Sequence, residues 1–151
     1  MNLIYNKNFY QNKFDKIIFI SPTSLNDLTL KHLAEDDDEI LKVSENLDKL
    51  DDILKAIVDD KDNDEESRAE HYLIILDDCL ADDTWKKDPN IKWLFYNGRH
   101  VKITVILTMQ FALGLPPQLR SNFQWVFLCR DNRITEQKKM YENFGSVFPS
   151  F

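Results

Sequence analysis

Three short runs of apolar residues constrain the fold of this chain more than any other feature of its sequence. They cover Lys16–Ser21, Tyr72–Leu76 and Ile103–Thr108, and a fourth run follows at Trp125–Cys129. Each run is apolar on successive residues instead of alternate ones, which is typical of strands that are covered on both faces. None approaches the roughly 18–20 apolar residues that a membrane span needs. The runs therefore predict buried strands and no membrane partner.

Helical patterns lie between these runs. In the first, apolar residues recur at helical spacing after Ser44, a candidate N-cap: Leu47, Leu50, Leu54, Ile57 and Val58. Two further stripes consist of Ile91, Leu94 and Phe95, and of Met140, Tyr141 and Phe144. Strands that alternate with helices predict an α/β fold, in which a parallel sheet carries helices on both faces. Because 151 residues is an ordinary size for one domain, we expect residues 1–151 to form a single domain.

The negative charge of the chain is concentrated in one segment. The chain has 26 acidic and 19 basic residues, and 16 of the acidic but only 5 of the basic residues lie between Glu35 and Glu70. The remainder is mildly basic, so the overall charge does not exclude a nucleic-acid partner. Within the segment, Asp59–Glu70 has almost no apolar residue, which predicts an exposed connection. We therefore expect an acidic, partly disordered stretch at about residues 35–70.

Two acidic residues directly follow the second apolar run. In parallel sheets, ligands gather beyond the carboxyl ends of the strands. Asp77 and Asp78 stand at such an end after four apolar residues, which is the Walker B form of nucleotide hydrolases. There, the first carboxylate reaches the Mg²⁺ of the nucleotide and the second lies beside the attacking water. The alternative interpretation is a turn or a helix N-cap, where Asp is also enriched.

The third run has candidate residues at both of its ends. Gln110 follows it, and its amide could orient a hydrolytic water or sense a γ-phosphate if the two strands are neighbours. The alternative is an exposed loop glutamine. Arg99 precedes the run, at the opposite edge of the sheet, so it could serve only the nucleotide of a neighbouring subunit. The alternative is a surface arginine beside a helix C-terminus.

Several other kinds of site are absent from the sequence. None of its three glycines belongs to a GxxxxGK[ST] or GxGxxG pattern, so the chain has no phosphate-binding loop of its own. Cys79 and Cys129 lack the spacing of zinc ligands, which favours free thiols in a reducing compartment and argues against secretion. No GxSxG or HExxH motif is present.

The order of these motifs resembles that of the genome-packaging ATPases of poxviruses and other large DNA viruses, which are P-loop motors similar to the FtsK–HerA group. The resemblance rests on YLIILDDCLAD, LFYNGRHVKITVILTMQ, LPPQLRSNFQWVF and NRITEQKKMYENFG, with FDKIIFISPTSLNDLT nearer the front. It covers most of the chain outside the acidic stretch. It implies a RecA-like core, in which Asp77 is the Mg²⁺-linked acid, Asp78 the catalytic acid, Gln110 the sensor and Arg99 a finger acting in trans.

The chain departs from this family at its front. Family members begin with a strand, a Walker A loop and a helix, whereas this sequence opens at Met1–Tyr5, which resembles the second half of that helix. The Walker A loop would supply most of the phosphate and Mg²⁺ contacts. A smaller departure is Gln124, where many relatives carry an acid. We therefore expect an N-terminally truncated P-loop fold that hydrolyses ATP negligibly alone, with Met1 as a candidate internal methionine.

The resemblance also implies cofactors, partners and a location. Mg²⁺ and ATP are the expected cofactors, and double-stranded DNA, a homo-oligomeric ring and viral capsid proteins are the expected partners. The expected location is the virion or the host-cell cytoplasm. The alternative class is a non-catalytic relic that keeps the fold and acts by binding or regulation. A flavodoxin-like or signalling domain also fits the strand pattern, but it does not explain Arg99 and Gln110 together.

Overall fold

The computed structural model describes residues 13–22, 41–44, 47–79, 84–110 and 115–145. The structure divides into two compact units, Met1–Met109 and Gln110–Phe151, which are described separately, and the expectation of a single domain stays a prediction. The features predicted at residues 1–12 and the acidic residues at 35–40 lie outside the described residues. All strands of the sheet lie in the first unit.

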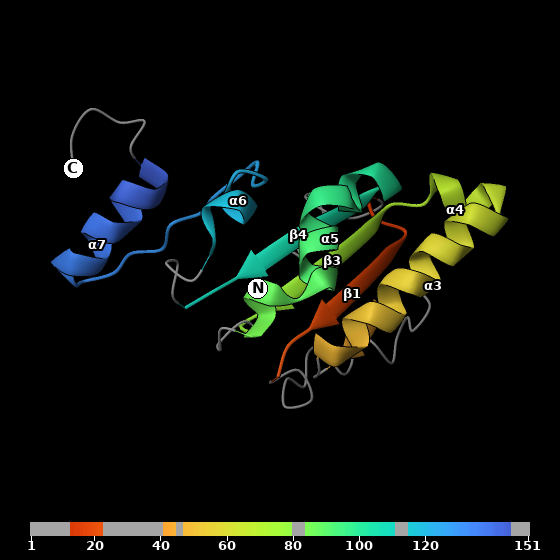
Figure 1. Ribbon diagram of the computed structural model, residues 1–151, viewed down its shortest axis with the longest axis horizontal. Helices are drawn as coiled ribbons and strands as arrows, with labels where there is room; N and C mark the ends of the chain where they lie inside the picture. Colours follow the sequence, from red (N-terminus) through yellow and green to blue (C-terminus); the bar gives the residue numbers. More distant parts are fainter. Residues whose placement is uncertain (1–12, 23–40, 45–46, 80–83, 111–114, 146–151) are drawn as a thin grey trace. The chain divides into compact units, whose positions relative to one another are not determined.

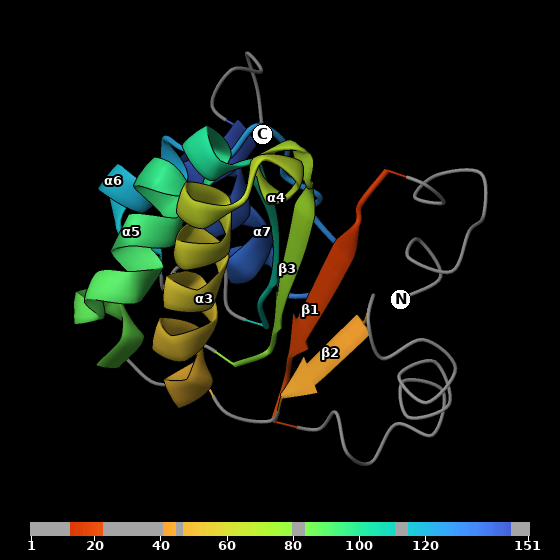
Figure 2. The ribbon, with the colours of Figure 1, turned by 90° about the vertical axis from the view of Figure 1, so that its right-hand side faces the viewer.

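A parallel sheet of four strands, in the order β2-β1-β3-β4, forms the centre of the first unit (Figures 1 and 2). Its strands are β1 (Lys16–Ile20), β2 (Leu41–Ser44), β3 (Tyr72–Asp77) and β4 (Ile103–Thr108). The three main apolar runs are therefore strands, and the predicted α/β class with a parallel sheet is confirmed. The sequence did not predict β2, which lies inside the acidic stretch.

β1 and β3 are covered on both faces, as their unbroken apolar sequences predicted. Ile18–Ile20 and Leu73–Leu76 are each at most 4% exposed. Side chains of one face, those of Phe19, Leu73 and Ile75, form a packed cluster. The edge strand β4 is less covered, because its residues 105–107 are only half-buried. The carboxyl end of β3 lies between β1 and β4 and pairs with both strands.

The helices of this unit cover one face of the sheet (Figure 2). They are α3 (Leu50–Asn63), α4 (Glu65–Ala69) and α5 (Pro89–Asn97), with short 3₁₀ turns η2 (Leu47–Lys49), η3 (Thr84–Lys87) and η4 (Gly98–Val101). Two of the three predicted stripes are confirmed in their central residues, which are buried: Leu50, Leu54 and Ile57 in α3, and Ile91 and Leu94 in α5. The other members of these two stripes, Leu47, Val58 and Phe95, are half-buried, as are all three residues of the third stripe. Helices on the second face stay a prediction, since the described part of the unit places none there.

Two details of the helix prediction are wrong. Ser44 ends β2 and caps no helix, and α3 begins only after the turn η2. Asp59–Glu70, expected to be an exposed and partly disordered connection, is mostly helical, because α3 extends to Asn63 and α4 follows it. Most of this segment is exposed, as expected, but Lys61 is only 6% exposed. One inward-facing lysine therefore gives an acidic segment the anchor that its composition did not predict.

The second unit contains α6 (Pro117–Arg120), α7 (Ile134–Met140) and a π-helical turn η6 (Tyr141–Gly145). Arg120 donates a hydrogen bond to the side-chain oxygen of Asn143. The predicted strand at Trp125–Cys129 is wrong: the segment is irregular, with Trp125 80% and Phe127 83% exposed. A strand needs a neighbour for its backbone hydrogen bonds, and no described residue pairs with this run. None of the described helices has the length and apolar character to cross a membrane.

Candidate active site at the carboxyl end of the sheet

β3 brings two acids to the carboxyl end of the sheet. Asp77 is the last residue of the strand and is half-buried, whereas Asp78 follows it and is exposed. The four residues before them are buried and pair with β1 on one side and β4 on the other. The strand therefore fixes where the acid pair stands, at the sheet edge where parallel sheets place their ligands.

Hydroxyl groups from both neighbouring strands contact the Asp77 carboxylate. Thr108, the last residue of β4, donates from Oγ1 to Asp77 Oδ1 over 2.6 Å. Ser21, directly after β1, donates from Oγ to Asp77 Oδ2 over 3.3 Å. A carboxylate oxygen has two lone pairs, so each oxygen keeps the capacity to bind a cation. Three adjacent strand ends thus orient one carboxylate without saturating it.

Thr108 also contacts the backbone of the second acid. The Asp78 N–H donates to the Thr108 carbonyl oxygen over 3.3 Å and to its Oγ1 over 3.2 Å. Asp78 has a φ of 50°, which lies in the left-handed region that Asp tolerates better than most residues. One threonine side chain therefore reaches both acids, the first through its carboxylate and the second through its amide.

The electrostatics of this end of the sheet disfavour additional negative charge. Burial raises the pKa of the Cys79 thiol to about 11, and the neighbouring charges of Asp77 and Asp78 act in the same direction. A thiolate at this position would be desolvated and would lie near two carboxylates. The charges of the two carboxylates, unlike the burial, favour a cation at this end of the sheet.

The structure places the other two predicted residues at different ends of β4. Gln110 is exposed and comes two residues after the end of the strand, as the first residue of the second unit. Arg99 is exposed in the turn η4, before the strand begins. Its guanidinium makes no hydrogen bond or ion pair within the described ranges. Arg99 is thus at the opposite end of β4 from Thr108, as expected, and the roles of both residues stay predictions.

The donor groups at this edge fit magnesium better than a transition metal. No group of three or more His, Cys, Asp or Glu side chains that could hold a metal occurs among the residues that the structure describes. Mg²⁺ beside a nucleotide usually takes only one or two protein carboxylates and completes its shell with water and phosphate oxygens. The carboxylate of Asp77, flanked by two hydroxyl oxygens, fits that pattern of hard oxygen donors.

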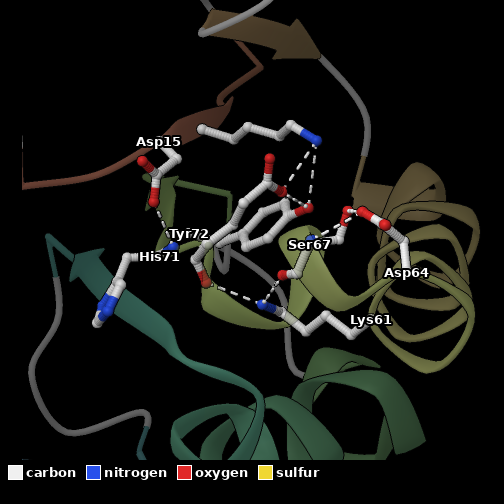
Figure 3. Close-up of polar contacts among 8 residues, drawn as sticks. Asp15, Lys61, Asp64, Ser67, His71 and Tyr72 are labelled. Carbon is white, nitrogen blue, oxygen red and sulfur yellow. Dashed lines mark hydrogen bonds and ion pairs between the residues drawn. The ribbon is translucent and has the colours of Figure 1, made fainter.

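A second polar cluster surrounds Tyr72 at the amino end of the same sheet (Figure 3). The Tyr72 hydroxyl donates to Glu70 Oε2 over 2.8 Å, and Lys16 Nζ forms an ion pair with that oxygen at 3.1 Å. Lys61 Nζ donates to the carbonyl oxygens of Ser67 and Glu70 over 2.9 Å and 2.8 Å. It also lies 4.9 Å from the centre of the Tyr72 ring. This cluster therefore ties α3 and α4 to the start of β3.

Burial shifts the pKa values of two groups in this second cluster. Burial lowers the pKa of Lys61 and raises the pKa of Tyr72. The start of β1 is joined to the cluster by the Asp15 side chain, which accepts the His71 N–H over 2.7 Å (Figure 3). Each charged group named here has a partner within the cluster, which is typical of a structural network and not of an open site.

Sequence reasoning marked Ser21 and Thr108 as strand-end residues but gave neither a role. Both are hydroxyl-bearing residues at the ends of apolar runs, and that signal was available. What was missing is the strand order, since only β1 and β4 as the two neighbours of β3 bring these hydroxyls to Asp77.

Comparisons with known proteins give further findings. The sequence model of a family described as Poxvirus A32 protein matches residues 4–144. The chain is 44% identical over 79 residues to the uncharacterized protein L437 of Acanthamoeba polyphaga mimivirus, covering 52% of this chain and 28% of that protein. It is 39% identical over 83 residues to the uncharacterized protein 015R of Frog virus 3 (isolate Goorha), covering 55% and 26%. The matched segment thus spans less than a third of either relative. No solved structure matches the chain.

Proposed function

The chain belongs to the poxvirus A32 protein family, and from this premise we propose that it is the acid-bearing part of an ATP-driven motor that packages viral double-stranded DNA. The observation that carries the proposal is the acid pair Asp77-Asp78 at the end of a buried parallel strand. The similarity to proteins of other large DNA viruses supports it. The activity is proposed for a protein in which these residues are joined to a phosphate-binding loop.

We propose that the sheet belongs to a RecA-like P-loop core. β1 and β3 are each paired on both sides, whereas β4 is at the edge of the sheet that the described residues form, and its residues 105–107 are only half-buried. A further strand, with the phosphate-binding loop after it, could therefore pair with the open side of β4. That position would bring the loop to the same sheet edge as Asp77, because the ends of parallel strands meet there.

The chain's own residues would divide the chemistry among them. When bound, Mg²⁺ and ATP supply the phosphoanhydride and the positive charge that stabilises phosphoryl transfer. Asp77 would hold the metal through a carboxylate oxygen, in the orientation given by Ser21 and Thr108. The exposed Asp78 would accept the proton of the attacking water, and Gln110 would orient that water.

Arg99 would act on a neighbouring copy. An exposed guanidinium at the amino end of β4 is separated from its own acid pair by the full length of the strand. In a head-to-tail ring, the amino end of one sheet can face the carboxyl end of the next. Such a ring would enclose the DNA and would act at the capsid, in the virion or the host-cell cytoplasm.

Steady-state ATPase measurements test this function. We expect negligible turnover from the 151-residue chain and turnover from a longer protein that carries a GxxxxGK[ST] segment ahead of Met1. In the longer protein, Asp78→Asn should lower turnover by about a thousandfold or more while ATP binding is retained, since it removes the water-activating carboxylate. The matched control is Asp59→Asn on the exposed side of α3, which should leave turnover unchanged.

Mixed assemblies test the role of Arg99. Arg99→Ala subunits mixed with Asp78→Asn subunits should recover part of the activity, because some interfaces then combine an intact arginine with an intact acid pair. Arg130 is also an exposed arginine, so Arg130→Ala is the control, and its subunits should keep the wild-type ATPase rate without mixing. Robust ATP turnover by the 151-residue chain alone would overturn the proposal that hydrolysis needs an added phosphate-binding loop. Absence of mixed rescue would remove Arg99 from the trans role.

A further inference from the structure

Thr108 occupies an unusual place among the residues near the acid pair. Its hydroxyl O–H donates to Asp77 Oδ1 over 2.6 Å, and its hydroxyl oxygen accepts the Asp78 N–H over 3.2 Å. The hydroxyl therefore has one partner on its donor side and one on its acceptor side. This use of both capacities fixes the direction of the hydroxyl proton, which must lie toward the carboxylate.

We propose that Thr108 is the positioning residue of the acid pair: its hydroxyl sets the orientation of the Asp77 carboxylate and the backbone turn that presents Asp78. Only the metal-binding consequence of this inference rests on the proposed function. The positioning itself concerns groups of this chain alone.

The geometry explains why one side chain can control both acids. Asp77 and Thr108 are paired across β3 and β4 in the sheet register, so their side chains leave the sheet on the same face. The Asp78 N–H continues this pairing, because it also donates to the Thr108 carbonyl oxygen. The hydroxyl adds a second acceptor for an N–H whose residue has a φ of 50°. Ser21 is the weaker partner, since its hydroxyl is 3.3 Å from the carboxylate.

The chain offers a matched set of variants for a test. Thr108→Val keeps the branched shape that β4 favours but removes the hydroxyl. Thr108→Ser keeps the hydroxyl, and Thr104→Val makes the same change at an exposed position of the same strand. If Thr108 acts through its hydroxyl, only the first variant should change the acid pair. All three should unfold at similar temperatures, which shows that the strand itself is intact.

The first measurement needs no metal. Three-bond NMR couplings of the 151-residue chain report the side-chain rotamer of Asp77. We expect one dominant rotamer in the wild type, in Thr108→Ser and in Thr104→Val, and averaged couplings in Thr108→Val, with a shifted Asp78 amide resonance. Rescue by serine distinguishes a hydroxyl effect from a general loss of packing. Couplings in Thr108→Val equal to those of the wild type would overturn the proposal.

The second measurement separates this inference from the proposed function. Mn²⁺, used as a paramagnetic probe, should broaden the amide resonances at the end of β3, and Asp77→Asn should remove that broadening. Thr108→Val should weaken it about tenfold, in line with the effect of groups that orient metal ligands. One outcome would separate the two roles: couplings that are averaged in Thr108→Val, together with no Mn²⁺ broadening in the wild type. It would support the positioning role of Thr108 and count against the metal role of Asp77. Equal Mn²⁺ broadening in Thr108→Val and in the wild type would overturn the link between the positioning role of Thr108 and metal binding by Asp77.

Discussion

The strand β3 begins at Tyr72 and ends at Asp77, and the polar groups at its two ends are arranged in opposite ways. At the amino end, the Tyr72 hydroxyl donates to Glu70 and the ammonium group of Lys61 donates to two carbonyl oxygens. At the carboxyl end, one carboxylate is oriented but not saturated, and the carboxylate of the next residue, Asp78, lies at the surface.

This difference suggests what each end is for. A closed network of charges and hydrogen bonds lowers the free energy of the folded chain and offers nothing to a ligand. An oriented acid pair with spare acceptor capacity contributes little to folding but can bind a cation or take up a proton. Substitutions at the amino end should therefore change stability, and substitutions at the carboxyl end should change activity.

The largest expected effect compares one acid from each end. In a longer protein that carries a phosphate-binding loop, Asp77→Asn should lower the ATPase rate by about a thousandfold or more, because the proposed carboxylate ligand of Mg²⁺ is lost. Its free energy of unfolding should change by less than about 0.5 kcal/mol, since the amide oxygen still accepts from Thr108.

Glu70→Gln is the counterpart at the amino end. It should leave the ATPase rate within about twofold and lower the free energy of unfolding by about 1 kcal/mol, because the charge that pairs with Lys16 is lost. ATPase assays and urea unfolding of both variants measure the contrast. Comparable losses of activity in the two variants would remove the distinction between the ends.

The next largest effect concerns the buried lysine. Lys61→Met should lower the free energy of unfolding by about 2 kcal/mol, because two carbonyl oxygens lose a charged donor while the aliphatic stem is kept. Lys55→Met, on the exposed side of the same helix, should cost less than about 0.5 kcal/mol. Urea unfolding followed by circular dichroism compares them. Equal costs would mean that Lys61 does not anchor α3 and α4.

Lys61 also shows where prediction from sequence stopped. The strands β1, β3 and β4 were predictable, because an unbroken apolar run can be buried only when both of its faces are covered. The acidic segment around Lys61 was predicted to be exposed and partly disordered from its composition, which carries no information on which lysine faces inward. The run Trp125–Cys129 has the composition of a strand but is exposed. A strand also needs a neighbour, and composition does not supply one.

The same limit applies to the site. Asp77 and Asp78 were predictable because they directly follow a buried run, so local sequence fixes their position. The contact of Thr108 with both acids was not, because it depends on β4 lying beside β3 in a register that pairs Thr108 with Asp77. Register is a property of two segments about 30 residues apart.

Cys79 gives a chemical probe of the carboxyl end with a smaller effect. With a pKa of about 11, its thiol should react with iodoacetamide about tenfold more slowly at pH 8 than the exposed Cys129 does. Asp78→Asn should speed the reaction of Cys79 and leave Cys129 unchanged, since one neighbouring negative charge is lost. Mass spectrometry of each cysteine-containing peptide over time gives both rates. Equal rates for the two cysteines would contradict the raised pKa of Cys79, and an unchanged rate in Asp78→Asn would contradict the contribution of the neighbouring carboxylate.

The smallest effect is a pH dependence at the amino end. At neutral pH, Tyr72→Phe should lower the free energy of unfolding by about 1 kcal/mol, because the hydrogen bond to Glu70 is lost. Burial raises the pKa of Tyr72 above the ordinary value of 10.0, so the folded chain keeps the phenolic proton at a pH where the unfolded chain begins to lose it. The extra free energy of unfolding of the wild type over Tyr72→Phe is therefore complete below pH 10, and it is lost as the pH rises through the raised pKa of Tyr72. The lowered pKa of Lys61 acts in the opposite direction, but it is present in both proteins and largely cancels in their difference. Urea unfolding of the two proteins between pH 8 and pH 11 should show a gap that narrows above pH 10, and a gap that stays constant or widens would place Tyr72 outside a closed network.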